Sequence, residues 1–120
     1  MKVCRGDIFY ITGNKAVEGS EQNQDKPAVI VSNDIGNEHS PVVEVVFLTK
    51  CEKARYMPTH CKVLCKIPSV AMCEQVTSVS KTRLGEYVRS CTDKEMQAID
   101  RCLKISLGLT QPTKGHAAKN

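Results

Sequence analysis

Residues 42–49, VVEVVFLT, constrain the fold more than any other part of the chain. Apart from Glu44 and Thr49 they are all apolar, and most are β-branched, which favours a strand over a helix. A nearly continuous apolar run of this length is typical of a strand buried on both faces. No apolar run in the chain reaches the roughly 18 residues that a membrane-spanning helix needs. The segment therefore predicts a strand inside the core of a β-rich domain.

Other apolar or alternating segments predict more strands. They cover residues 7–11, 26–32, 59–65 and 69–79, while residues 82–88 fit a short strand or a helical turn. A long polar loop, residues 13–26, precedes the second strand, and a turn-rich link, residues 33–41, follows it. Long polar loops are usually functional or disordered.

A C-terminal helix is predicted after residue 92. Thr92 and Glu95 have the spacing of a capping box, and Gly108 suits the end of the helix. The apolar residues between them recur at helical spacing: Met96, Ile99, Cys102 and Leu103. The sequence thus predicts a mainly β protein with α additions, namely a small, strongly bent β-barrel with a C-terminal helix. We expect one domain over residues 1–109 and a disordered tail over residues 110–120.

The seven cysteines point to reduced thiols. Their number is odd, and no two of them have CxxC spacing. The alternative of a metal site would use His60, Cys61 and Cys65 with Cys51 or Cys73, but it lacks a second short-spaced pair. We therefore expect no metal and no cofactor. The first residues lack the apolar core of a signal peptide, so a cytoplasmic protein with no membrane association is expected.

The formal net charge of +4 allows a polyanionic partner without requiring one. Tryptophan is absent and aromatic residues are few, which argues against a base-stacking platform of several rings. The chain has no nucleophile elbow, P-loop, HExxH motif or dinucleotide fingerprint. Function therefore has to be sought among polar residues near strand ends: Lys26, Thr49, His60 and Gln75.

A cation beside a hydroxyl suits phosphate chemistry. Lys26 can neutralise charge on a phosphoryl oxygen, and Thr49 can donate a hydrogen bond to the same group. RNA carries its own nucleophile, the 2′-OH. Cleavage of RNA therefore needs only positioning, charge stabilisation and proton transfer.

Nine short segments, in order along almost the whole chain, carry a family resemblance. They are RGDI (5–8), GSEQ (19–22), PAVI (27–30), NDIGN (33–37), SP (40–41), LT (48–49), PTH (58–60), EQV (74–76) and ISLGL (105–109). In these segments the chain resembles the MazF/PemK toxins of type II toxin–antitoxin systems. The resemblance implies an SH3-like barrel of the CcdB/MazF type and a homodimer. It also implies a MazE-like antitoxin as partner, with which such toxins bind DNA.

The implied activity is metal-independent, sequence-specific cleavage of single-stranded RNA, leaving 2′,3′-cyclic phosphate and 5′-OH ends. The family's catalytic pair is an Arg before the Pro of the second strand and a Thr ending the third. Thr49 matches, whereas Lys26 replaces the Arg. The implied RNA-binding residues are Ser20, Glu21, Gln22, His60 and Gln75.

The replacement at position 26 has a physical consequence. Lysine keeps the positive charge but lacks the planar fork that binds phosphate through two parallel hydrogen bonds. A buried lysine also releases a proton more readily than arginine does. We expect activity to be retained, although possible outcomes include a slower reaction and a weakened toxin that acts mainly by binding antitoxin.

Each predicted site residue also has a structural alternative. Lys26 could be a solvated loop residue, and Thr49 could bond its own backbone. His60 could be a structural histidine, a contact to RNA or a proton donor. Gln75 could read a base edge or bond neighbouring backbone. A CcdB-like toxin that binds gyrase without catalysis is the rival function, because the same barrel supports it.

Overall fold

A computed structural model describes residues 2–13 and 25–111 of the 120-residue chain. Its elements in chain order are β1 (Asp7–Ile11), β2 (Lys26–Ile30), α1 (Asp34–His39), β3 (Val42–Lys50), the 3-10 turn η1 (Cys51–Lys53), β4 (His60–Cys65), β5 (Ile67–Ser80), the 3-10 turn η2 (Lys81–Arg83), β6 (Leu84–Ser90) and α2 (Asp93–Ser106). The predicted strands and C-terminal helix are present. Most of the predicted polar loop, and most of the predicted tail, lie outside the described residues.

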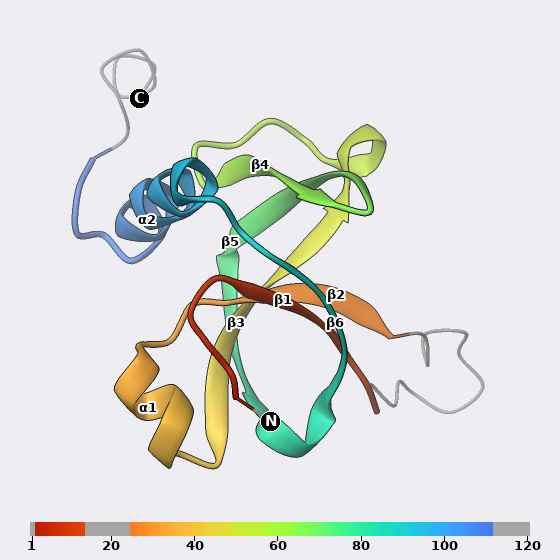
Figure 1. The fold of residues 1–120 in the computed structure, drawn as a ribbon. Helices are drawn as coiled ribbons and strands as arrows, with labels where there is room; N and C mark the ends of the chain where they lie inside the picture. The colour runs from red at the N-terminus through yellow and green to blue at the C-terminus, as the bar shows by residue number, and fades with distance from the viewer. Residues whose placement is uncertain (1, 14–24, 112–120) are drawn as a thin grey trace.

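The strands form one antiparallel sheet in the order β4-β5-β3-β2-β1-β6. Strands β3 and the long β5 extend from the lower to the upper part of the molecule (Figure 1). They therefore connect the part of the sheet that contains β1, β2 and β6 with the part that contains β4. The pairing of β3 with β5 shifts register between Val46 and Leu48, which lets the sheet bend there. The sheet therefore curves into an open barrel, as the sequence predicted.

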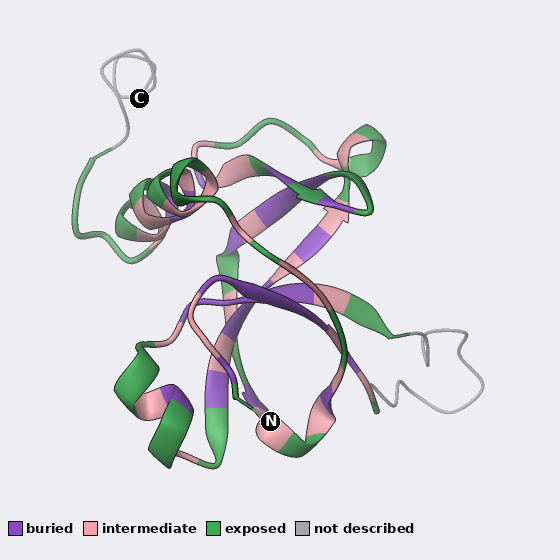
Figure 2. Ribbon diagram, in the orientation of Figure 1, coloured by how far each residue is buried: buried purple, intermediate pink, exposed green. Residues whose placement is uncertain are grey.

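Two hydrophobic clusters lie on opposite faces of this sheet, and β3 contributes to both. Val43 and Val45 belong to the cluster inside the barrel with Phe9. Val46 and Leu48 belong to the cluster beneath α2. Figure 2 shows buried residues running along the strands, whereas much of the surface of α1 and α2 is exposed. The predicted burial of residues 42–49 on both faces is confirmed.

Helix α2 starts with the predicted capping box. The Thr92 side chain accepts from the Glu95 backbone N–H, and Glu95 Oε1 accepts from the Thr92 backbone N–H at 2.8 Å. Glu95 also accepts from the Leu64 backbone N–H at 3.0 Å and pairs with Arg89 at 3.0 Å. Arg89 in turn donates to the Leu64 carbonyl at 2.7 Å. One carboxylate thus caps the helix and fastens it to β4.

The link between β2 and β3 contains a short helix that the sequence analysis did not predict. Asn33 caps α1 by accepting from the Gly36 backbone N–H at 2.7 Å. Asn37 is 1% exposed and donates to the Ser32 carbonyl and to Asp34. These turn-forming residues therefore form a helix of six residues instead of an irregular link. In the described part of the chain, no helix has the length and apolar character needed to cross a membrane.

Candidate active site

Lys26 and Thr49 lie near the ends of neighbouring strands. Lys26 begins β2 and pairs with Ile11 of β1, and Thr49 is the penultimate residue of β3 and pairs with Val70 of β5. The pairing of β2 with β3 ends at Ala28 and Phe47. Lys26 and Thr49 each lie two residues beyond the same end of this antiparallel ladder.

Strand alternation places both residues on the same face of the sheet. Lys26 alternates with Ala28 of the cluster inside the barrel, and Thr49 alternates with Phe47, which packs against that cluster. Helix α2 covers the other face, where Ile99 is fully buried. Lys26 is exposed and Thr49 is partly exposed. A cation and a hydroxyl are thus presented on the side of the sheet opposite α2.

His60 begins β4 and is held by two acceptors. Its Nδ1 lies 2.7 Å from the Arg55 carbonyl oxygen, and its Nε2 lies 3.0 Å from Glu74 Oε2. Both ring nitrogens of His60 therefore have a hydrogen-bonding partner. Thr59 Oγ1 donates to the other Glu74 oxygen at 2.9 Å.

The balance of effects on Glu74 favours its ionised form. Partial burial acts to raise its pKa, but the hydrogen bonds from His60, from its own backbone and from Thr59 outweigh burial, and the pKa is lowered. The His60 side chain is only 9% exposed. Because both of its nitrogens are occupied, the geometry favours a role for His60 in holding the segment before β4 rather than in donating a proton.

Gln75 lies beside the same ladder. It is exposed, and its Nε2 lies 4.0 Å from the Met72 sulfur. Met72 pairs with His60 across β4 and β5, and Val70, two residues earlier, pairs with Thr49. Thr49 and His60 thus lie on the two strands that flank β5, and β5 itself carries Gln75.

The remaining predicted residues, Ser20, Glu21 and Gln22, lie outside the described residues. Glu74 was missed by the sequence analysis as a site residue. Only the packing of β4 on β5 brings the Glu74 side chain to His60, although its place beside Gln75 in the EQV segment was a signal.

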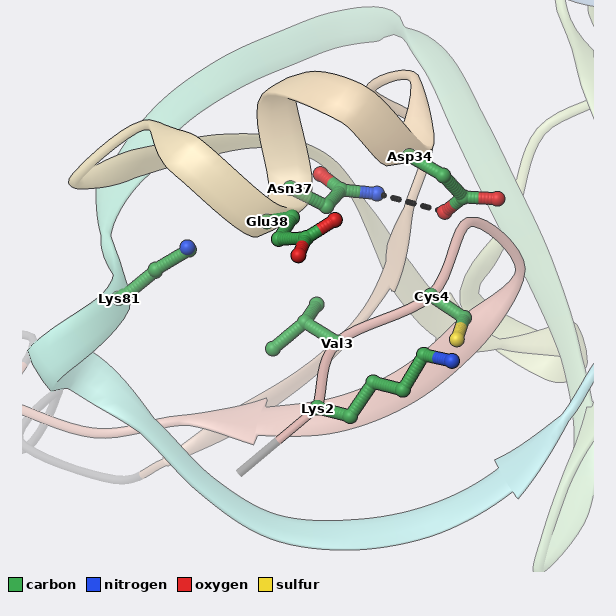
Figure 3. Close-up of a pocket in the computed structure, with 7 residues that line it drawn as sticks. All are labelled: Lys2, Val3, Cys4, Asp34, Asn37, Glu38 and Lys81. Atoms are coloured by element: carbon green, nitrogen blue, oxygen red, sulfur yellow. Dashed lines mark hydrogen bonds between the residues drawn. The ribbon is translucent and has the colours of Figure 1, made fainter.

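A separate pocket of about 570 Å³ lies near the N-terminus and contains none of the predicted site residues. Figure 3 shows the residues that line it: Lys2, Val3, Cys4, Asp34, Asn37, Glu38 and Lys81. The backbone N–H of Arg5 and the amide of Asn37 donate to Asp34, which lowers the Asp34 pKa. These contacts support the α1 fold and do not extend the Lys26–Thr49 site.

Comparisons with known proteins agree with this fold. One solved structure, an "Endoribonuclease in complex with its cognate antitoxin from Mycobacterial species", aligns with a TM-score of 0.76 and 26% identity, covering 92% of this chain and 99% of that chain. A MazE-MazF structure from Deinococcus radiodurans (Form-II) aligns with a TM-score of 0.78 at 16% identity, covering 92% of this chain and 99% of that one. The second likeness supports the fold alone.

Sequence comparison is more specific. The chain is 39% identical over 112 residues to a protein named Endoribonuclease MazF from Staphylococcus saprophyticus, covering 88% of this chain and 91% of that protein. Residues 4–107 match the family model of the PemK-like, MazF-like toxin of type II toxin-antitoxin systems. The chain therefore belongs to the PemK-like, MazF-like toxin family.

Proposed function

We propose that this protein is an endoribonuclease toxin that cleaves single-stranded RNA at a specific sequence. The observation that carries the proposal is its 39% identity, over 88% of its length, to an Endoribonuclease MazF. The placement of Lys26 and Thr49 on adjoining strands and the same sheet face supports it.

The RNA 2′-OH attacks the adjacent phosphorus, the P–O5′ bond breaks, and the products end in a 2′,3′-cyclic phosphate and a 5′-OH. Lys26 stabilises the charge that develops on the phosphoryl oxygens, and Thr49 positions the phosphate or helps to move a proton. The reaction needs no metal, because the nucleophile belongs to the substrate and the charge is met by a side chain.

RNA contacts are assigned to the face that carries Lys26 and Thr49. Gln75 offers an exposed amide for a base edge. His60 supports the surface through its bonds to Arg55 and Glu74. Ser20, Glu21 and Gln22 remain predicted RNA-binding residues from the family resemblance.

The proposed partners are a MazE-like antitoxin and a second copy of the toxin, in the cytoplasm. The mycobacterial endoribonuclease of the same fold, 26% identical, is in complex with its cognate antitoxin. A flexible acidic segment of the antitoxin would complement a chain of net charge +4. By covering the RNA face it would neutralise the toxin.

Replacement of Thr49 by alanine tests the catalytic assignment. We expect Thr49→Ala to reduce the cleavage of a long RNA by about 10²-fold or more, because a hydrogen bond to the reacting phosphate is lost. Mapping of the product ends should show cyclic phosphates with the unaltered protein. Thr110→Ala, at an exposed residue beyond α2, is the matched control and should cleave normally. Full activity of Thr49→Ala would refute its role, and intact RNA together with inhibition of gyrase would favour the CcdB-like alternative.

Replacement of Lys26 by arginine tests whether the missing fork limits the rate. A second charge-assisted hydrogen bond to the transition state, worth about 1.4 kcal/mol, would raise kcat/KM about tenfold. Lys26→Ala should lower it, since the charge is removed. Lys81→Arg on η2 controls for a general effect of arginine. An unchanged kcat/KM for Lys26→Arg would show that the missing planar guanidinium group does not limit the rate. The role of the positive charge is tested separately by Lys26→Ala.

A further inference from the structure

Three cysteines from three different elements meet beneath α2. Cys61 comes from β4, Cys73 from β5 and Cys102 from α2, and their Sγ atoms all lie within 4.8 Å of one another. We call this group the thiol cluster. Cys73 and Cys102 are buried, whereas Cys61 is half-buried.

The fold brings these sulfurs together by strand alternation and helix packing. Cys61 pairs with Ala71 across the β4–β5 ladder, and Cys73 lies two residues further along β5 on the same face. On α2, Cys102 follows the fully buried Ile99 by three residues, so both point to the sheet. The cluster is thus fixed by the main core and not by a surface loop.

The separation of the sulfurs suits a single metal ion. A zinc–sulfur bond is about 2.3 Å, so three sulfurs around one ion stand about 4 Å apart. Thiolate ligands select soft ions such as Cu(I), and Zn²⁺ would need a fourth ligand, such as water. We propose that Cys61, Cys73 and Cys102 form a three-sulfur binding site for a soft metal ion, with Cu(I) as the ion that fits best.

Binding of the ion releases the thiol protons of the cluster to solvent and leaves the oxidation state of copper unchanged.

A bound ion would connect α2 to both strands of the β4–β5 hairpin. Next to Cys61 and Cys73 in sequence are His60 and Glu74, whose side chains pair on the opposite face of that hairpin. The thiol cluster therefore lies one residue along each strand from the His60–Glu74 pair, which is on the proposed RNA-binding side of the hairpin. Metal binding would therefore stiffen the β4–β5 hairpin that supports the proposed RNA-binding face.

The test measures copper binding by the whole chain, independently of ribonuclease activity. Protein purified without oxygen, in a non-thiol reductant, is titrated with Cu(I) in competition with a coloured copper chelator. We expect one tightly held ion per chain, ultraviolet thiolate-to-copper charge-transfer absorption and a rise in the melting temperature. Cys61→Ser should weaken binding by about 100-fold or more, since loss of a ligand should cost at least as much as loss of an outer-shell contact.

Cys51→Ser is the matched control, because Cys51 is half-buried and lies outside the cluster. It should bind copper as the unaltered protein does. Cys102→Ala provides a second ligand variant if Cys61→Ser does not fold, as judged by circular dichroism. Equal copper affinity in the ligand and control variants would overturn the proposal. The proposal would also be overturned if the unaltered reduced protein released all of its copper to the chelator. The same holds if the reduced protein takes up no metal and its cluster forms a disulfide in air.

Discussion

The His60–Glu74 pair can be tested by two replacements of the same carboxylate. Glu74 accepts from Thr59 and from His60, and its side chain is 29% exposed. In Glu74→Gln the amide oxygen can still accept from Thr59. The amide N–H₂ can donate to His60 Nε2 in the tautomer whose Nδ1 donates to the Arg55 carbonyl.

The two replacements should therefore differ in cost. Glu74→Gln exchanges a charge-assisted hydrogen bond for a neutral one, which lowers the free energy of unfolding by about 1 kcal/mol. Glu74→Ala removes both bonds and leaves the Thr59 hydroxyl, 9% exposed as a residue, and a largely buried His60 N–H without their acceptor. At about 1–3 kcal/mol for each such group, we expect a loss of about 3 kcal/mol.

Urea unfolding at pH 7, followed by circular dichroism at one fixed protein concentration, measures both losses. The contribution of Glu74 should also depend on pH. Since hydrogen bonding lowers its folded pKa below the usual 4.5, the stabilisation is present above pH 4.5 and is lost as the pH falls through the lower folded value. The difference between the unaltered protein and Glu74→Gln should therefore shrink in acid.

Two results would refute this account. Equal stability of all three proteins at pH 7 would mean that the carboxylate does not hold His60 and Thr59. A difference between the unaltered protein and Glu74→Gln that grows below pH 4.5 would show that the charged form of Glu74 is not the stabilising one.

Two further replacements test how the helices are attached. Glu95→Ala should lower the free energy of unfolding by about 2–3 kcal/mol in urea, because it removes a helix cap and the contacts to Leu64 and Arg89. Glu86→Ala, the control, breaks only an exposed ion pair and should change stability little. Equal losses would contradict the special role of Glu95. Asn37→Ala should cost about 2 kcal/mol by the same measurement, since it removes the buried amide that holds α1, and a neutral effect would show that α1 is not fixed by this residue.

The parts of the fold that depend on local pattern could be predicted. The apolar run at residues 42–49 and the capping box of Thr92 and Glu95 are readable from neighbours in sequence, and β3 and α2 are where they indicate. Helix α1 was missed because six residues give too few turns for an apolar stripe, and its stability comes from the buried Asn37.

The candidate site required knowledge of which strands pair. Lys26 and Thr49 could be named from the family resemblance, but their common face follows only from the register of β2 on β3. Glu74 becomes a partner of His60 only when β4 lies on β5. Cys102 was assigned to an apolar stripe, since nothing in the sequence shows that the helix returns to the hairpin that carries Cys61.

The contacts that Leu64 makes with Glu95 and Arg89 have a consequence for solubility. Strand β4 is an outermost strand of the sheet, so its backbone groups on the side away from β5 are open to pairing with another chain. The two side chains occupy the N–H and C=O of Leu64, an exposed leucine in that strand. Glu95 of α2 and Arg89 of β6 thus keep the Leu64 backbone from pairing with a strand of another chain. A protein that loses Glu95 would be expected to grow by strand addition at high concentration, even where it still folds.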